Sequence, residues 1–278
     1  MGKFSRTWSL MGASWQVLKE DKEILIFPLI SGICCLLVMA SFGVPLFASG
    51  NWQPPGKEAA AGEHVEYYAI LFLFYFCTYF IMVFFNSAII ACAVIRMGGG
   101  DPTVKDGFRA ALSRIGLIAG WALVSATVGI ILRIIEDRSK LVAKIVAGVL
   151  GLAWSVTSFL VVPILVVEKK GPIMAVKDSA LLLKKTWGEQ IIGNFSFGLV
   201  FFVLTMPAIA LIIIGVFIGS PAATVTFIGL GAVYIVVLAL IQSALQAIFQ
   251  AAVYLYARDG QVPEGFESGL LRDAMLQR

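Results

Sequence analysis

The chain alternates between long apolar runs and short charged segments. Six apolar runs recur along its 278 residues, and each meets the need for about 20 residues to cross a hydrocarbon core of about 30 Å. Runs this long and continuous cannot be barrel strands, and helices satisfy their backbone polar groups internally. The pattern predicts an all-α polytopic membrane bundle with transmembrane helices near residues 24–47, 67–95, 115–135, 141–167, 191–218 and 223–257.

The segments between the runs carry a repeated pattern. The tripeptide Val-Lys-Asp recurs at 104–106 and 176–178, each time after a proline suited to a first helical turn, Pro102 and Pro172. Apolar residues follow at helical spacing, as they also do at the N-terminus. Helices with Trp and Leu on one face and Lys on the other lie in the headgroup layer. We expect interfacial helices whose apolar faces include Trp8, Trp15, Phe108 and Trp187.

These helices divide one membrane domain, residues 1–278, into three parallel repeats. Each repeat would consist of one interfacial helix followed by a transmembrane hairpin, so that all three enter the membrane in the same direction. This plan lacks the inverted symmetry that is common in secondary transporters. The expected units cover approximately 1–100, 101–170 and 171–260, followed by an amphipathic cytoplasmic tail at 261–278.

Charge sets the predicted orientation. Of the 21 Lys and Arg residues, sixteen lie at the termini and in the loops on the same side of the membrane, and five lie on the other side. Positive residues concentrate on the cytoplasmic side. We therefore expect a multi-pass protein of the cell (inner) membrane with both termini cytoplasmic. The net charge of +4 then indicates affinity for anionic headgroups and gives no reason to propose nucleic acid.

Residues for catalysis are sparse. The four cysteines lie in apolar runs, where cysteine behaves as a small hydrophobe, and His64 is the only histidine. Metal chemistry and Ser-His or Cys-His catalysis therefore lack their usual residues. We expect no enzyme activity, no cofactor and no metal site. The acids near the inner surface are interpreted as helix caps and topology charges: Asp101, Asp106, Glu168 and Asp178.

Five amides are expected in the inner half of the bundle. Gln242, Gln246 and Gln250 recur every four residues on the last helix, and Asn86 and Asn194 lie at a similar predicted depth. One hypothesis is a polar cavity that opens to the cytoplasm and serves as a pathway or binding site. The alternative is that amides bridge neighbouring helices, each bond contributing about 0.6–2 kcal/mol. The lack of charges at this depth favours the second.

Small residues at a four-residue spacing predict close helix packing. The neighbouring helix can belong to the same chain or to another subunit, so a homo-oligomer stays open. Pro163 and Pro207 are expected to kink the fourth and fifth helices. The small residues are Gly116 and Gly120 on the third helix and Ala143, Ala147, Gly151 and Ser155 on the fourth.

Three segments carry a resemblance to a known family. They are the N-terminal FSRTWSLMGASWQVLKEDKEILIFPLISG, the FFNSAII of 84–90 that leads into GGGDPTVKDGFRAA, and KKTWGEQIIGN at 184–194. Over nearly its whole length the chain resembles a family of uncharacterised prokaryotic six-helix membrane proteins, which implies fold and location but no activity. The hairpin plan is also similar to the membrane domain of some glycerophosphodiester phosphodiesterases, whose catalytic carboxylates and metal ligands are absent here.

Two classes of function remain. We favour a noncatalytic membrane-organising or partner-binding protein that works through its cytoplasmic interfacial helices. Its partners would be membrane lipids, including anionic headgroups, and a protein or a second copy at the cytoplasmic face. The alternative is a channel or transporter for a small polar or lipid-like solute that uses the five amides. The two differ in whether these amides line a water-accessible cavity.

Overall fold

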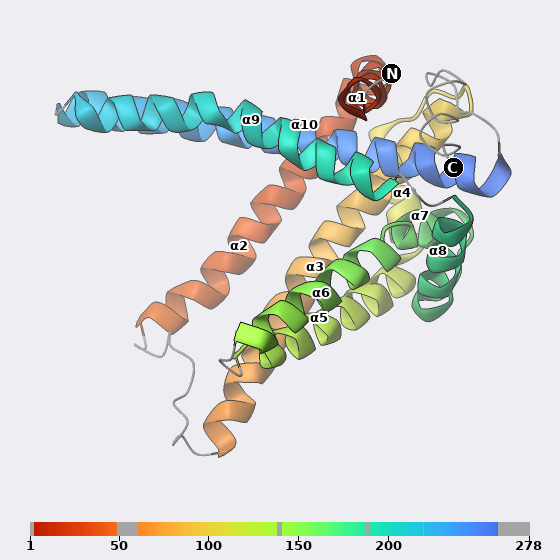
Figure 1. Ribbon diagram of the computed structural model, residues 1–278, viewed down its shortest axis with the longest axis horizontal. Helices are drawn as coiled ribbons and strands as arrows, with labels where there is room; N and C mark the ends of the chain where they lie inside the picture. Colours follow the sequence, from red (N-terminus) through yellow and green to blue (C-terminus); the bar gives the residue numbers. More distant parts are fainter. Residues whose placement is uncertain (1–2, 49–60, 138–140, 187–189, 219, 261–278) are drawn as a thin grey trace. The chain divides into compact units, whose positions relative to one another are not determined.

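The computed structural model describes residues 3–48, 61–137, 141–186, 190–218 and 220–260. All regular secondary structure in these ranges is helical, so the predicted fold class is confirmed. In chain order the helices are α1 (Lys3–Glu20), the 3₁₀ helix η1 (Lys22–Leu25), α2 (Ile26–Ala48), α3 (Ala61–Met97), α4 (Val104–Leu112), α5 (Ile115–Asp137), α6 (Leu141–Thr157), α7 (Val161–Val167), α8 (Pro172–Thr186), α9 (Gln190–Phe217) and α10 (Pro221–Asp259) (Figure 1).

Six segments of the described chain are long and apolar enough to cross a membrane. Large apolar side chains remain exposed along them, and Phe217 reaches 85% exposure. Contiguous apolar surface of this extent is unfavourable in water but is covered by acyl chains in a bilayer. The chain is thus a multi-pass helical membrane protein. The segments are Lys22–Ala48, Val65–Met97, Ile115–Glu136, Ala143–Val167, Gly198–Phe217 and Pro221–Asp259.

The fourth membrane segment is interrupted rather than simply kinked. α6 ends at Thr157, and α7 restarts at Val161. Pro163 is the third residue of α7 and has no N–H to donate to the carbonyl of Phe159, so a continuous helix would lose a hydrogen bond there. The break therefore lies before the proline. The other predicted kink residue, Pro207, lies inside α9.

The helix after the second membrane segment begins later than the sequence pattern predicts. Thr103 is its N-cap and Val104 its first residue, so Pro102 precedes the helix and does not lie in its first turn. The corresponding proline in the next copy, Pro172, is the first residue of α8, as predicted. The expected amphipathic tail lies outside the described residues.

The chain divides into two compact units. Unit 1 contains Met1–Pro28, Ala93–Pro102 and Lys184–Arg278, and unit 2 contains Leu29–Cys92 and Thr103–Leu183. The unit boundary passes through α2 and α3, so each of these helices contributes to both units. This division does not test the three predicted repeats, which stay a prediction.

Unit 1 is built around the α9–α10 hairpin. The two helices run side by side (Figure 1), and the hydroxyl of Tyr234 on α10 donates to the carbonyl oxygen of Leu204 on α9 at 2.9 Å. α1 and η1 also contact α10. The buried apolar side chains of α1 include Val17 and Leu18, and those of α10 concentrate between Ala244 and Tyr254. Interior packing thus lies in the C-terminal part of α10, while most of the part nearer the hairpin turn is exposed.

Unit 2 contains the α5–α6 hairpin (Figure 1). The rings of Trp121 on α5 and Trp154 on α6 stack with their centroids 5.5 Å apart. On α4, the ring of Phe108 lies 6.3 Å from that of Phe84 and 6.1 Å from that of Phe85, both on α3. Aromatic contacts between successive elements therefore hold this unit together.

Candidate functional site

The structure does not test whether the five predicted amides form one layer. Gln242 and Gln250 are half-buried on α10, whereas Gln246 is exposed. Asn86 is half-buried on α3 and belongs to unit 2, while the glutamines belong to unit 1. Asn194 lies in α9, but its side chain is outside the described set. The polar cavity and the interhelical bridges both stay predictions.

The predicted small residues have different surroundings. A Cβ added at Gly120 would lie 3.1 Å from Cγ of Pro172, so this glycine lets the first turn of α8 approach α5 closely. A Cβ at Gly151 would lie 3.8 Å from Cδ1 of Leu132, and Ala147 on the same face is buried. Of the other members, Ala143 is half-buried, and Gly116 and Ser155 are exposed. A Cβ added at Gly116 would meet no heavy atom within 4 Å.

The predicted interfacial aromatic residues lie in different surroundings. Phe108 packs on α3 as described above, and Trp15 of α1 is partly exposed. Lys19, one helical turn after Trp15, places its Nζ 5.8 Å from the centroid of the tryptophan ring. The side chain of Trp8 and the whole of Trp187 lie outside the described set.

An ion cluster joins distant parts of unit 1. Nε of Arg96 donates to Oδ2 of Asp21 at 2.5 Å, and Nη2 of Arg96 donates to Oδ1 of Asp21. Nη2 also donates to Oδ1 of Asp101 at 2.5 Å. Asp21 is only 8% exposed, Arg96 is 22% exposed and Asp101 is 91% exposed. The paired arrangement between Arg96 and Asp21 fixes the α1–η1 connection against the end of α3, and Asp101 adds a solvent-facing contact.

A second acid is used as a helix cap. The hydroxyl of Thr103 accepts from the backbone N–H of Asp106 at 3.3 Å, while the Thr103 backbone N–H donates to Oδ2 of Asp106 at 3.1 Å. This reciprocal capping box satisfies two donors at the start of α4. The hydrogen bonds from Thr103 lower the pKa of Asp106 below its usual value.

α8 is attached to the break between α6 and α7. The buried backbone N–H of Leu160 donates to the hydroxyl oxygen of Ser179 on α8 at 3.1 Å. A buried N–H without an acceptor costs about 1–3 kcal/mol, so Ser179 removes the penalty that the helix break would otherwise carry. Ala175 and Leu183 are buried on the same side of α8. Val176 is half-buried and Ala180 is exposed.

One lysine fixes the connection that leads into α8. Nζ of Lys170 lies 2.6 Å from Oε2 of Glu168 and 2.6 Å from Oδ2 of Asp178. The hydrogen bonds that Lys170 donates to Asp178 and then to Glu168 raise the pKa of Lys170 above its usual value. Both acids are therefore engaged in the ion pairs of this connection.

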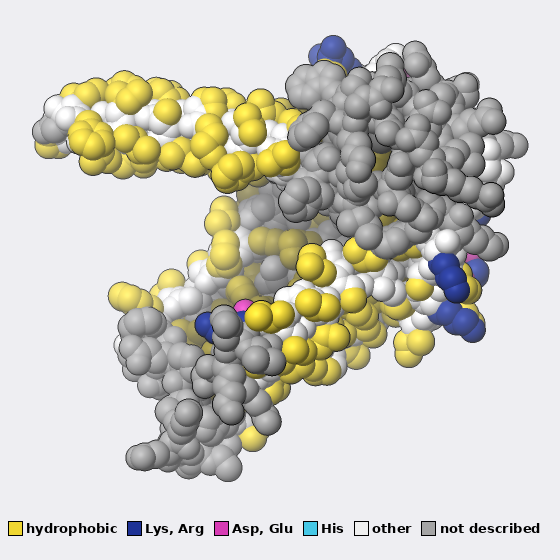
Figure 2. All heavy atoms as spheres, in the orientation of Figure 1, with side chains coloured by type: hydrophobic (Ala, Val, Ile, Leu, Met, Phe, Trp, Pro, Cys, Tyr) yellow, Lys and Arg dark blue, Asp and Glu magenta, His cyan; other side chains and the backbone are white. Residues whose placement is uncertain are grey.

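The opposite side of α8 is exposed and mixes apolar with basic side chains. Ile173 is 80% exposed, Met174 is 53% exposed and Leu181 is 50% exposed. Lys177 and Lys184 are exposed among them, and dark blue Lys and Arg atoms gather over this helix in Figure 2. Such a surface suits the boundary between acyl chains and anionic headgroups.

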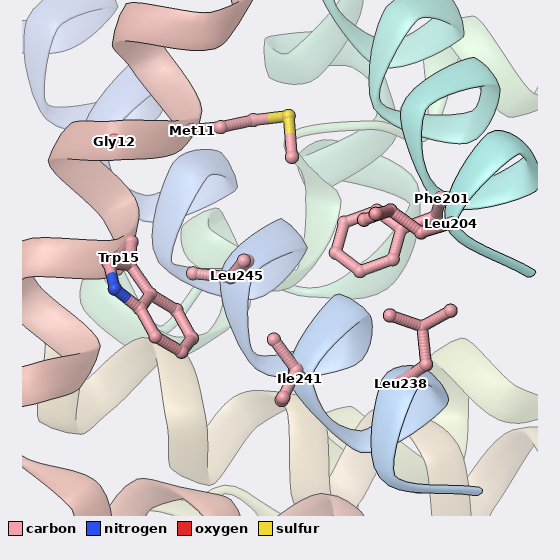
Figure 3. Close-up of a pocket in the computed structure, with 8 residues that line it drawn as sticks. All are labelled: Met11, Gly12, Trp15, Phe201, Leu204, Leu238, Ile241 and Leu245. Atoms are coloured by element: carbon pink, nitrogen blue, oxygen red, sulfur yellow. The ribbon is translucent and has the colours of Figure 1, made fainter. Parts of the chain in front are cut away.

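A groove in unit 1 lies between α1, α9 and α10 (Figure 3). It has a volume of about 370 Å³. Trp15 approaches from one side and Phe201 from another, with α10 between them. The lining residues are Met11, Gly12, Trp15, Phe201, Leu204, Leu238, Ile241 and Leu245.

The sequence alone did not reveal this groove or the Asp21–Arg96 pair. The groove residues come from helices that are almost 200 positions apart in the chain, and hydrophobic periodicity on one helix does not say which helix it faces. The only local signal was the helical spacing of apolar residues at the N-terminus, which predicted an interfacial helix. Asp21 gave no signal, because its partner lies 75 positions away.

Comparison with known proteins gives a family but no activity. No curated protein matches the chain. The family model that matches is described as a family of unknown function (DUF6159), and it covers residues 65–265. This agrees with the expected resemblance to a membrane protein family without known activity, whereas prokaryotic origin and the phosphodiesterase-domain likeness stay predictions. Because the match covers more than two thirds of the 278 residues, the chain belongs to the family of unknown function DUF6159.

Proposed function

We propose that this protein is a noncatalytic membrane-organising protein that gathers anionic lipids at the cytoplasmic face of the inner membrane. Its interfacial helices α1, α4 and α8 would lie in the headgroup layer, with both termini cytoplasmic. The observation that carries the proposal is the exposed side of α8, where Ile173, Met174 and Leu181 accompany Lys177 and Lys184. Apolar side chains of this size favour the acyl boundary, and each lysine near an anionic surface contributes about 1 kcal/mol.

The state of the inner acids supports a noncatalytic role. Asp101 pairs with Arg96, Asp106 caps α4, and Glu168 and Asp178 pair with Lys170. A general acid or base must be within reach of a substrate. These carboxylate oxygens are instead engaged by partners in the protein. These groups thus act in structure and anchoring.

The attachment of α8 gives the exposed side a fixed orientation. Ser179 holds one side of the helix to the α6–α7 break, and Gly120 lets Pro172 approach α5. The exposed side consequently cannot turn inward without breaking a buried hydrogen bond. A held helix presents its lysines at one depth, which suits repeated binding of the same lipid headgroup.

Energy transfer in proteoliposomes tests the proposal. The full chain, with its four native cysteines replaced, carries a donor dye at Ala180→Cys, and the bilayer contains equal amounts of acceptor-labelled phosphatidylglycerol or phosphatidylcholine. We expect more transfer to phosphatidylglycerol, and we expect Lys177→Gln with Lys184→Gln to abolish the difference. Lys144→Gln on α6 is the matched control, because Lys144 is also exposed but near the predicted outer surface.

Equal transfer to both lipids in the parent protein would contradict the proposal. So would a preference that survives removal of both lysines. If the dye at position 180 is also shielded in native membranes but accessible in vesicles, a protein partner covers α8 and the lipid-gathering role is wrong.

A further inference from the structure

The groove in unit 1 has the chemistry of a site for one lipid molecule. We infer that it binds an acyl chain of an anionic phospholipid, whose headgroup lies beside Lys19. This inference rests on the proposed interfacial placement of α1, but it concerns a separate surface from α8 and different residues.

The lining of the groove selects an apolar ligand. Every side chain that lines it is hydrophobic, and the only lining residue without a side chain is Gly12. Its volume of about 370 Å³ lies within the range of about 300–1,000 Å³ that is typical of small-molecule sites. In a bilayer, the molecules available to fill an apolar hollow are acyl chains. The groove therefore fits part of a lipid tail better than a polar solute.

The position of the groove along α10 matches the inner boundary of the hydrocarbon layer. α10 has 39 residues and is about 58 Å long, which is nearly twice the hydrocarbon thickness. If its first residue, Pro221, lies at the outer surface, Leu238 lies about 26 Å inward and Leu245 about 36 Å inward. A layer of about 30 Å ends between them, beside Ile241. With this placement, the groove spans the depth at which acyl chains meet headgroups, and Gln242 lies at that boundary rather than in the inner half of the bundle as the sequence pattern predicts.

Charge next to the groove favours an anionic headgroup. Lys19 shares the helical face of Met11 and Trp15, because the three are spaced by four residues. Its ammonium lies 5.8 Å from the centroid of the Trp15 ring that lines the groove. The neighbouring acid, Glu20, is rotated by about 100° around α1 from Lys19. A phosphate beside Lys19 would therefore meet the cation before the carboxylate.

Gly12 provides a direct way to fill the groove without disturbing the protein. A Cβ added there has no heavy atom within 4 Å. Gly12→Leu should therefore occupy the space of the acyl chain without overpacking the helices. Gly148→Leu on α6 is the matched control, because Gly148 is also an exposed helical glycine with open space around a Cβ.

The experiment uses the full chain in lipid nanodiscs that contain a small fraction of phosphatidylglycerol or phosphatidylcholine with a photoreactive diazirine in the acyl chain. Labelled peptides are identified by mass spectrometry. We expect phosphatidylglycerol to label the segments around Trp15 and Phe201 about fivefold more than phosphatidylcholine, as about 1 kcal/mol from one lysine predicts. Gly12→Leu should lower this labelling about tenfold, Lys19→Gln should remove the lipid preference, and Gly148→Leu should change neither.

Unchanged labelling in Gly12→Leu would overturn the inference, as would equal labelling by both lipids in the parent protein. The outcome is separable from that of the proposed function. Lys177→Gln with Lys184→Gln should leave groove labelling unchanged, and Gly12→Leu should leave the lipid preference measured at α8 unchanged.

Discussion

Arg96, in the last turn of α3, donates two hydrogen bonds to the carboxylate of Asp21, which stands 75 positions earlier between α1 and η1. The planar guanidinium matches both carboxylate oxygens, an arrangement that a lysine cannot reproduce. Asp21 is only 8% exposed, and a buried ion pair that loses one partner is strongly destabilised. The pair therefore holds the α1–η1 connection against the end of α3.

Replacing Asp21 should be much more harmful than replacing the other acid on Arg96. Asp21→Asn removes the buried partner of a largely buried guanidinium, and we expect the free energy of unfolding to fall by about 2–3 kcal/mol. Asp101→Asn is the control and should cost less than about 1 kcal/mol, because Asp101 is exposed. Thermal unfolding in detergent gives the comparison. Equal losses of unfolding free energy in the two variants would show that the burial of Asp21 does not determine how much the pair stabilises the protein.

Ser179 should be essential for the attachment of α8. Ser179→Ala leaves the buried N–H of Leu160 without its acceptor, which should cost about 1–3 kcal/mol. Ser158→Ala is the control, since the hydroxyl of Ser158 donates to the carbonyl oxygen of Ser155 in an exposed hydrogen bond, and it should change stability by less than about 0.5 kcal/mol. Hydrogen exchange at the Leu160 amide should accelerate in the first variant only. A slow amide in Ser179→Ala would contradict this role.

The α9–α10 hairpin should tolerate a methyl group at Gly229 but not at Gly231. A Cβ at Gly231 would lie 2.7 Å from Cγ1 of Ile212 and 3.3 Å from the backbone oxygen of Ala208. Gly231→Ala should therefore destabilise the protein by about 1–3 kcal/mol. Gly229→Ala meets nothing within 4 Å, so the helix preference of alanine should leave it equal or up to about 1 kcal/mol more stable. The reverse order of unfolding temperatures would disprove the packing.

Acid should loosen the start of α4. The pKa of Asp106 is lower in the folded protein than its ordinary value, because Thr103 donates to the charged carboxylate. The stabilisation is therefore present above the unfolded value of about 4 and is lost as the pH falls through the lowered folded value. Amides in the first turn of α4 should exchange faster at about pH 3 than at about pH 5, after correction for intrinsic rates. Asp106→Asn should abolish this pH dependence, whereas Asp101→Asn should retain it. If the pH dependence persisted in Asp106→Asn, another titrating group would be responsible for it.

The sequence predicted those features that depend on one segment at a time. Each membrane helix is specified by its own apolar run, and α1, α4 and α8 occur where helical spacing predicted short helices. Capping was less predictable, because Thr103 and not Asp101 is the N-cap of α4. The Thr-x-x-Asp spacing was present but was not used. A capping box depends on only four consecutive residues, so it could have been recognised from the sequence.

Features that depend on two distant segments could not be predicted in this way. The buried side of α8 runs through Ala175, Ser179 and Leu183 because Ser179 meets the α6–α7 break. Helical periodicity gives the spacing of a face but not the rotation at which the helix docks. The same limit applies to the groove, where α1 presents Met11 and Trp15 to a helix hairpin near the other end of the chain.

Depth measurement along α8 tests the central claim most directly. Nitroxide labels are placed one at a time at positions 173, 174, 177, 181 and 184 of the full chain in bilayers that contain phosphatidylglycerol. Collisions with lipid-soluble oxygen and with a water-soluble nickel complex are then compared. Labels at 174 and 181 should favour oxygen, and labels at 173, 177 and 184, which lie about 50–90° further round the helix, should be more accessible to nickel, as an interfacial helix requires. Nickel access at all five positions would mean that α8 lies free in water. Protection from both reagents would mean that protein covers it, and either result would contradict a lipid-facing α8.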